Sequence, residues 1–272
     1  MDSFLQFFEQ MPSWQKLVWV GICLSVSWVL EGSYPLLKLN YRKWRHAGVN
    51  MVFMATSLSI SILFAATTVG VVEWVRNHEF GLLFLVDWPV FIELVVTVVL
   101  LDFVAQYFAH FLLHKVGLLW RVHMVHHSDT HVDATTGTRL HPGDFLVREA
   151  FALVAIVIAG APISFYLVYR FLTIFFTYLT HANLALPPSL DRAISWVFVT
   201  PNMHKFHHHF EMPWTDSNYG GILSIWDRMF GTFVYDDPLK IRYGLDVLSD
   251  ETDEDVLYQL KMPFDGDIKR GR

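Results

Sequence analysis

Long apolar stretches fill most of the first 180 residues of this 272-residue sequence. A helix needs about 20 apolar residues to cross the hydrocarbon core of a bilayer. Three segments clearly reach that length: residues 17–37, 51–75 and 89–113. Two further segments, 145–161 and 163–180, are separated at Ala161 and Pro162 and predict a helical hairpin that crosses the membrane or re-enters it. No apolar-polar alternation is long enough for a sheet, so the sequence predicts an all-α integral membrane helical bundle with about four transmembrane spans, or three plus a re-entrant hairpin.

The flanking segments are more polar. Residues 1–14 predict a short amphipathic segment at the membrane interface, and we expect no signal peptide because a basic start and a small-residue cleavage pattern are both missing. From Leu184 onward, polar residues, prolines and glycines place the chain in water or at the headgroups. These shifts divide the chain into N-terminal membrane spans (1–94), a histidine-rich domain (95–235) and an acidic C-terminal tail (236–272).

Charge and cysteine content exclude several classes of function. The net charge of −6 comes largely from the last quarter, where the run SDETDED (249–255) predicts a solvated tail. No basic surface suggests a nucleic-acid partner. Cys23 is the only cysteine, which excludes an internal disulfide framework and a thiolate metal site. Any metal must therefore be held by nitrogen or oxygen.

Basic residues predict the orientation in the membrane. The loop after the first span holds Lys38, Arg42, Lys43 and Arg45. The loop after the second span has Arg76 alone, so the first loop is predicted to be cytoplasmic. The third span then ends in the cytoplasm, and the hairpin returns residues 181–209 to the same side, which predicts a histidine-rich metal-site cap on the cytoplasmic face. With no lysine-rich retrieval tail or KDEL ending, we favour a bacterial inner membrane over the endoplasmic reticulum.

Twelve of the 14 histidines fall between residues 110 and 209. Eight of them form the groups HFLLH, HMVHH and HKFHH: His110, His114, His123, His126, His127, His204, His207 and His208. Positions i, i+3 and i+4 share a helix face, so each group is expected to aim its imidazoles at one place. Imidazole suits Zn, Cu, Fe and Ni, and eight ligands are twice what one tetrahedral zinc takes. Two metals are expected, and two redox-active irons held by neutral nitrogens would activate O2.

The other histidines and one carboxylate need separate interpretations. His141 in RLHP and His181 in THAN are candidate ninth and tenth ligands. His131 and His209 are not expected to bind metal, the latter because a third consecutive histidine points off the shared face. The remote His46 and His78 are expected to be solvated. Asp102 lies on the helix stripe of His110, where it would orient an imidazole or form a hydrogen bond between helices.

The order HxxxH, HxxHH, a lone histidine and HxxHH, followed by NYGGILSIWDRMFGTF (218–233), resembles the sterol desaturase and fatty acid hydroxylase superfamily of integral-membrane di-iron oxygenases. The resemblance covers roughly residues 95–235 and implies that this is the catalytic domain. It implies that the eight motif histidines are the metal ligands, with His141 and His181 at positions where many members also carry a histidine. The segment that contains Tyr219 and Asp227 matches the C-terminal signature of the family, and we expect it to pack beneath the site.

Within the superfamily, TPNMHKFHHH and NYGG are similar to the alkylglycerol monooxygenase branch, which is linked to tetrahydrobiopterin. Two residues depart from that branch: Lys115 replaces an acidic residue and Phe111 a basic one. RLHPGD is more similar to the sterol oxidase and bacterial hydroxylase branches. Tetrahydrobiopterin is therefore a doubtful cofactor.

These features predict a membrane-bound di-iron oxygenase that hydroxylates an unactivated C–H bond of a lipid (a fatty acyl chain, sterol or ether lipid). The lipid would enter from the bilayer, and a separate donor protein or reductant would supply electrons, because no haem-binding domain or flavin fingerprint is visible. Desaturation at the same site is an alternative. A metal transporter would place ligands midway through several spans or in loose loops, and a zinc hydrolase or isomerase would need a motif such as HExxH, which does not occur.

Overall fold

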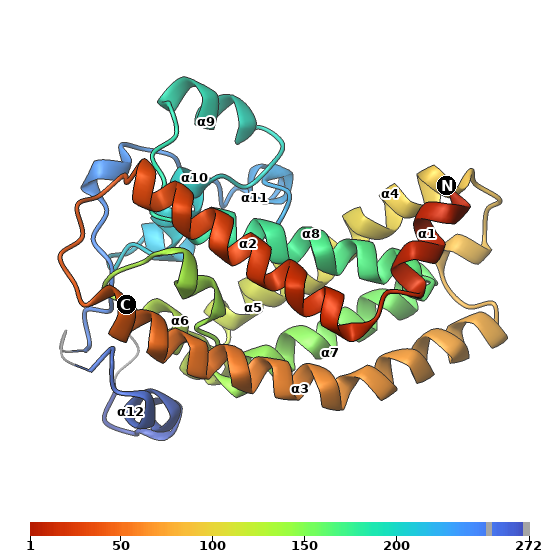
Figure 1. The fold of residues 1–272 in the computed structure, drawn as a ribbon, viewed down its shortest axis with the longest axis horizontal. Coiled ribbons are helices and arrows are strands. Elements are labelled where there is room, and N and C mark those ends of the chain that lie inside the picture. Colours follow the sequence, from red (N-terminus) through yellow and green to blue (C-terminus); the bar gives the residue numbers. More distant parts are fainter. Residues whose placement is uncertain (249–251, 269–272) are drawn as a thin grey trace.

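Five long helical segments form the body of the molecule (Figure 1). The computed structural model describes residues 1–248 and 252–268. Its long segments are α2 (Ser13–Ser33), α3 (Lys43–Asn77), the continuous run α4 (Val90–Leu101), η2 (Asp102–Phe108) and α5 (Ala109–Lys115), α7 (Pro142–Ala159) and α8 (Ile163–His181). Helix α3 packs along α7, α2 packs along α8, and α4 contacts both α7 and α8. The described residues form no strand longer than an isolated bridge, so the predicted all-α fold is confirmed.

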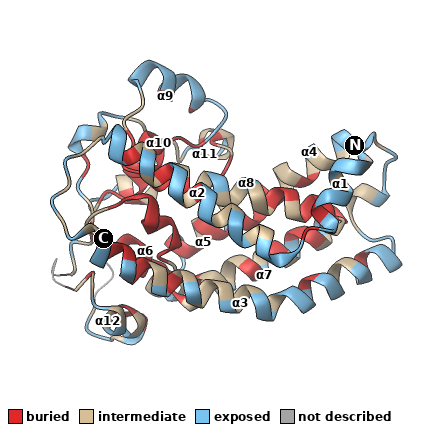
Figure 2. Ribbon diagram, in the orientation of Figure 1, coloured by how far each residue is buried: buried red, intermediate tan, exposed pale blue. Residues whose placement is uncertain are grey.

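Four of these segments are long and apolar enough to cross a membrane: Ser13–Ser33, Lys43–Phe84, Val90–Lys115 and Ile163–His181. Apolar side chains on α2 and α3 are widely exposed, including Val29 at 66%, Ile62 at 75% and Leu63 at 75%. Figure 2 shows that exposed positions run along both helices, whereas buried residues concentrate around α5, α6 and α10. Exposed apolar faces of this extent indicate contact with lipid.

Helices α7 and α8 form the predicted hairpin. Gly160 ends α7 in the left-handed conformation with φ of 78°. A Cβ atom at this position would lie 2.9 Å from the Phe80 carbonyl oxygen, so the turn favours glycine on two counts. Pro162 then precedes the first turn of α8, where its fixed φ is tolerated.

The third span is not a regular helix. Between α4 and α5, η2 is π-helical, a wider turn that is rare and occurs most often at functional sites. Leu101, just before it, packs in a core with Ala155, Ile156 and Ala159 of α7. The π-helical turn thus lies inside the apolar segment Val90–Lys115, between α4 and the histidines of α5.

Shorter elements surround the histidine end. They are α6 (Gly117–His127), η3 (Ala134–Thr138), α9 (Pro188–Ile194), α10 (Pro201–His207), η4 (Trp214–Asp216), α11 (Ile225–Met229), η5 (Pro238–Lys240), α12 (Val256–Lys261) and η6 (Met262–Phe264). At the other end, η1 (Leu82–Phe84) follows α3 and precedes α4. The predicted N-terminal interfacial segment forms α1 (Asp2–Glu9), whose Phe8 ring contacts Phe171 of α8 at a centroid distance of 5.1 Å.

The C-terminal segment is packed against the domain. Gln259 is fully buried and accepts a hydrogen bond from Ser128 at 2.8 Å. Arg121 of α6 donates to the Asp265 carbonyl oxygen at 2.8 Å. Asp253 is 5% exposed and accepts from Thr130, so the expectation of a solvated acidic run is wrong for this residue. Residues 249–251 of that run lie outside the described residues.

Candidate metal centre

Nine of the ten predicted ligand histidines come together in two buried groups. The five-histidine group contains His110, His114, His123, His127 and His207, and the four-histidine group contains His126, His181, His204 and His208. Within each group, the nitrogens that could bind an ion lie within 4.8 Å of one another. The His127 and His208 rings stack at a centroid distance of 4.8 Å, so the two groups are in direct contact.

Each HxxHH motif contributes to both groups, which differs from the expectation that each motif aims at one place. On α6, His123 and His127 face the five-histidine group, while His126 faces the four-histidine group. On α10 the division is reversed, because His204 and His208 join the four-histidine group. Residues i and i+4 differ in direction by only about 40° around a helix, whereas i+3 and i+4 differ by about 100°. The adjacent histidines of each motif therefore diverge and serve two centres.

Hydrogen bonds fix the ring orientations in the five-histidine group. The Nδ1 atom of His123 donates to Asp144 at 2.5 Å, and Nδ1 of His110 donates to the Tyr219 carbonyl oxygen at 3.0 Å. His207 donates likewise to the Ser217 carbonyl oxygen at 2.7 Å. Each Nδ1 thus holds the proton, which leaves the Nε2 lone pair directed into the group. Metal-binding histidines typically have such partners.

The four-histidine group uses backbone partners. The Nδ1 atom of His126 lies 3.2 Å from the Arg139 carbonyl oxygen, and Nδ1 of His181 lies 2.7 Å from the Thr177 carbonyl oxygen. Among the described residues, neither ring nitrogen of the buried His208 has a hydrogen-bond partner. An unsatisfied buried polar atom costs about 1–3 kcal/mol, so this ring fits a bound cation better than an empty core.

The closest contacts in both groups join Nε2 atoms. His110 and His123 approach at 3.0 Å, and His126 and His181 at 3.1 Å. All four rings hold their proton on Nδ1, so the facing atoms in each contact are two lone pairs, which repel each other unless a cation lies between them. Two nitrogens bound to one transition-metal ion at about 2.0–2.1 Å would lie roughly 2.9–3.4 Å apart. Both distances fit shared coordination.

The histidines of α6 and α10 are neutral at pH 7. Burial lowers the pKa values of His126, His127 and His208 well below the ordinary value, and the neighbouring imidazoles lower them further. Burial likewise lowers the pKa of His207 to about 3. The lone pairs needed for metal binding are therefore available over the physiological pH range.

Asp144 lies outside the five-histidine group and orients the His123 ring through a hydrogen bond to Nδ1. Burial raises its pKa, but the Arg148 guanidinium and His123 outweigh that effect and lower the pKa to about 2. Arg148 Nε donates to the other carboxylate oxygen at 2.7 Å. Asp144 was not among the predicted site residues, although its i,i+4 spacing to Arg148 at the start of an apolar helix was a usable signal.

Asp216 is a second carboxylate that the sequence analysis missed. It lies 3.3 Å from Nδ1 of His114, accepts from the Tyr219 hydroxyl at 3.0 Å, and pairs with Lys115. Lys115, singled out as a departure from the alkylglycerol monooxygenase branch, thus forms an ion pair next to a candidate ligand.

His141 lies outside both groups. Its Nδ1 atom accepts from the Gly143 amide at 3.0 Å, and its Nε2 donates to the Leu260 carbonyl oxygen at 3.3 Å. Both ring nitrogens are therefore engaged in capping α7 and in holding the C-terminal segment. We do not retain His141 in the ligand set. His131 and His209 also lie outside the groups, as expected.

The two remote histidines, His46 and His78, differ in solvent exposure. His78 is exposed, as expected. His46 is 1% exposed, and its Nε2 donates to the Asp129 carboxylate at 2.9 Å, so its predicted solvation is wrong. Asp129 also accepts from Thr136 of η3 at 2.6 Å. In the sequence, His46 lies near the start of a long apolar segment and beside several basic residues. Neither feature indicates an acidic partner 83 positions away.

Asp102 contacts none of the described imidazoles, but its second predicted role, a hydrogen bond between helices, is confirmed by its contact with Trp226 of α11. Its carboxylate accepts from the amides of Ile222 at 2.9 Å and Leu223 at 3.0 Å, and from the indole of Trp226 at 2.9 Å. Asp227 similarly accepts from the Tyr219 amide at 2.7 Å. Two buried carboxylates therefore hold the NYGG segment, whose Tyr219 carbonyl in turn orients His110.

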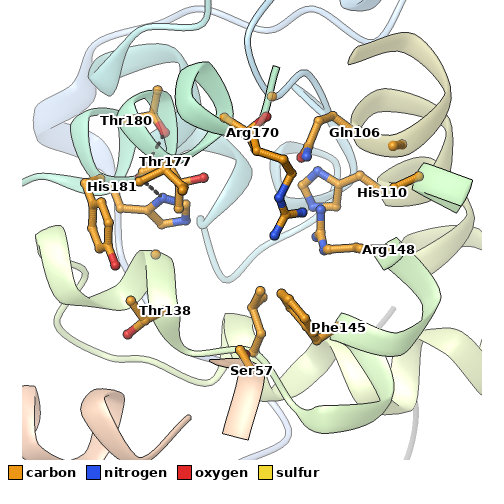
Figure 3. Close-up of a pocket in the computed structure, with 18 of the residues that line it drawn as sticks. Ser57, Gln106, His110, Thr138, Phe145, Arg148, Arg170, Thr177, Thr180 and His181 are labelled. Atoms are coloured by element: carbon orange, nitrogen blue, oxygen red, sulfur yellow. Dashed lines mark hydrogen bonds between the residues drawn. The ribbon is translucent and has the colours of Figure 1, made fainter. Parts of the chain in front are cut away.

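A cavity of about 200 Å³ adjoins both groups (Figure 3). Four candidate ligands form part of its wall: His110, His126, His181 and His204. Much of the remaining wall comes from α3, α7 and α8, and it combines apolar residues with threonines and the charged residues Arg148, Glu149 and Arg170. The cavity therefore connects the two histidine groups with the apolar helices.

Comparison with known proteins agrees with this geometry. Residues 94–232, about half of the chain, match the fatty acid hydroxylase family. The chain belongs to this family. The predicted superfamily resemblance is confirmed, and the histidine groups lie inside the matched region.

Individual relatives cover different parts of the chain. Ornithine lipid hydroxylase OlsE of Rhizobium tropici is 33% identical over 54% of this chain and 43% of its own length. Alkylglycerol monooxygenase of Caenorhabditis elegans is 31% identical over 58% of this chain and 30% of its own. A cholesterol 25-hydroxylase-like protein of Danio rerio is 24% identical over 86% of this chain and 97% of its own. The chain thus spans less than half the length of the first two relatives. No solved structure matches.

Proposed function

We propose that this chain is a membrane-bound di-iron oxygenase that hydroxylates an unactivated C–H bond of a lipid. The observation that carries the proposal is the pair of Nε2–Nε2 contacts, at 3.0 and 3.1 Å, in two adjoining groups of buried histidines. Each group supplies enough nitrogen ligands for one ion, and imidazole is a suitable ligand for iron. The names of the relatives, a lipid hydroxylase and a monooxygenase, support the same reaction class.

The five-histidine group would hold one iron and the four-histidine group the other. When bound, the two irons would supply O2 activation and the oxidising power to remove hydrogen from carbon. The chain itself holds the ligand nitrogens neutral and correctly turned through their Nδ1 hydrogen bonds. Electrons would come from a separate donor protein, and the metal site would face the cytoplasm, as the charge of the first loop predicts.

The cavity supports a lipid substrate. A cavity of about 150 Å³ lined by apolar side chains can bind benzene, so about 200 Å³ has room for a short segment of a lipid rather than a whole molecule. Leu58 of α3, Ala152 of α7 and Ile174 of α8 contribute apolar walls. These residues would place a chain segment against His110 and exclude water from the reacting carbon.

A metal transporter is less well supported. Transport requires ligands that release their ion along a path, whereas the His123 and His207 rings are fully buried and held by Nδ1 hydrogen bonds. Most of the histidines come from α6 and from α10 with the residue that follows it, and these two helices lie at one end of the bundle. Hydroxylation is favoured over desaturation because hydroxylase names recur among the relatives.

The decisive experiment is the metal content of the full chain, purified rapidly in detergent and analysed for iron, zinc and copper by mass spectrometry. We expect two irons per chain, loss of iron and turnover in His207→Ala, and no change in the control His78→Ala. Zinc in place of iron would be followed by iron reconstitution before lipid oxidation is assayed. One metal or none after reconstitution, or full activity in His207→Ala, would overturn the proposal.

A further inference from the structure

Two arginines face the cavity beside the metal-binding groups. Arg148 lies on α7 and Arg170 on α8, within one of the apolar spans. Figure 3 shows both guanidinium groups pointing toward one another near His110 and Gln106. Charged side chains within membrane helices are costly and usually serve a function. Two guanidinium groups directed into one cavity between apolar helices therefore need a specific explanation.

Their partners inside the protein use only a small part of their hydrogen-bonding capacity. Arg148 donates from Nε to Asp144, and Arg170 donates from one terminal nitrogen to Glu149, each at 2.7 Å. In the described part of the chain, neither guanidinium makes another hydrogen bond; the Arg170 guanidinium also faces the Tyr166 ring at 6.0 Å. A guanidinium has five N–H donors and stays charged, so several donors remain directed toward the cavity.

The neighbouring carboxylates cannot satisfy these donors. Asp144 is fully buried and already shared between Arg148 and His123. Asp144 and Glu149 each pair with one guanidinium at 2.7 Å, so the charges balance while several N–H donors stay unused. Planar guanidinium groups recognise carboxylate and phosphate by paired hydrogen bonds. An anionic oxygen group would fill the unused donors.

We propose that Arg148 and Arg170 bind the anionic head group, a carboxylate or a phosphate, of an acyl lipid. This assignment rests on the proposed function and names its substrate class. Arg148 is linked through Asp144 to the candidate ligand His123 by hydrogen bonds of 2.7 and 2.5 Å. The bound head group therefore lies close to the five-histidine group, and the C–H bond that reacts lies near the head group rather than at the end of the acyl chain.

Equilibrium binding tests this inference without relying on turnover. The full chain in detergent is titrated with three radiolabelled probes that share one acyl chain: palmitate, 1-palmitoyl-lysophosphatidate and the neutral 1-palmitoylglycerol. Hydrogen bonds to charged groups contribute enough for about a tenfold effect each. We expect at least one anionic probe to bind about tenfold or more tightly than the neutral probe, with palmitate and lysophosphatidate distinguishing a carboxylate from a phosphate.

Variants then assign the preference to the arginines. Arg148→Gln and Arg170→Gln should each reduce it about tenfold while binding of the neutral probe persists, which shows that the cavity is intact. Arg170→Lys keeps the charge but loses the paired geometry, and should retain part of the preference. Arg76→Gln, at an exposed position near the end of α3, is the matched control and should behave as wild type.

Three results would overturn the inference: equal binding of anionic and neutral probes by the wild type, a preference that survives both substitutions, or complete displacement of the acyl probe by millimolar inorganic phosphate. The last would identify free phosphate as the ligand. The comparison of anionic and neutral probes on the wild-type chain remains a valid test even if a variant fails to fold. Anionic-lipid binding without any oxidised product would support the head-group site and refute the proposed reaction. Oxidation of neutral lipids alone would support the proposed reaction and refute the head-group site.

Discussion

The two histidine groups differ in what holds their rings. In the five-histidine group, Asp144 and Asp216 contact ligand rings directly, so two of its members have carboxylate partners. In the four-histidine group, the Nδ1 partners of His126 and His181 are backbone carbonyl oxygens. A carboxylate makes an imidazole a stronger donor to a metal. The two irons are therefore expected to be inequivalent, with the tighter site in the five-histidine group.

The largest expected effect comes from removing a ligand of the smaller group. His208→Ala leaves that group with three imidazoles, and we expect iron to fall to one per chain or fewer and turnover to fall by more than about a hundredfold. Iron content and product formation are measured on the same preparation. The neighbouring His209→Ala is the control, because His209 lies outside both groups and accepts a hydrogen bond from the Glu211 amide. Equal iron content in the two variants would contradict the grouping.

A carboxylate substitution tests the difference between the groups. Asp144→Asn removes the charge that supports His123, and loss of such a partner typically costs 10–100-fold in metal affinity. Chelator competition should therefore show that the iron of the five-histidine group is weakened more than the iron of the four-histidine group. Asp216→Asn should have a smaller effect, because its contact with His114 is 3.3 Å and the carboxylate is partly exposed. Equal weakening of both irons would contradict the assignment of Asp144 to the five-histidine group.

Acid should destabilise the metal-free protein. The pKa of His207 is about 3 in the folded chain, below its unfolded value of about 6.5, so the unfolded state binds more protons as the pH falls below about 6.5. The stabilisation present above that pH is then lost progressively down to the folded pKa, by about 1 kcal/mol per such histidine between pH 6.5 and 5.5. Thermal unfolding of the chelator-treated protein at pH 7.5, 6.5 and 5.5 measures this. An unchanged Tm across the series would contradict the neutral state of the buried rings.

The smallest effect is expected at His141. His141→Ala removes a cap from α7 and should cost about 0.5–2 kcal/mol of stability, while iron content stays at the wild-type value. Unfolding and metal analysis of one preparation separate the two outcomes. Loss of iron with unchanged stability would return His141 to the ligand set.

Local sequence patterns predicted the helices and the gathering of the histidines at one site. They did not predict hydrogen-bonded pairs of residues that are far apart in the sequence. The apolar segments and the break at Pro162 were sufficient for the bundle and the hairpin, because these features depend on neighbouring residues. The pairs His46–Asp129 and Asp102–Ile222 join residues 83 and 120 positions apart. No spacing rule within one helix reveals them.

The division of each HxxHH motif between two centres was missed for a different reason. The i, i+3, i+4 rule describes one broad face of a helix, and it does not separate directions that differ by about 100°. The separation becomes visible only when the neighbouring helices are in place, with His114 from α5 on one side of α6 and His181 from α8 on the other.

Because α6 and α10 each supply ligands to both groups, occupancy of one site is mechanically tied to the other. An ion held by His123, His127 and His207 would fix the rotation of both helices, and with it the directions of His126, His204 and His208. The second ion would then meet a preformed set of ligands and lose less entropy on binding. Metal uptake should accordingly be cooperative, with a sigmoidal loading curve and few singly loaded molecules at intermediate iron concentrations.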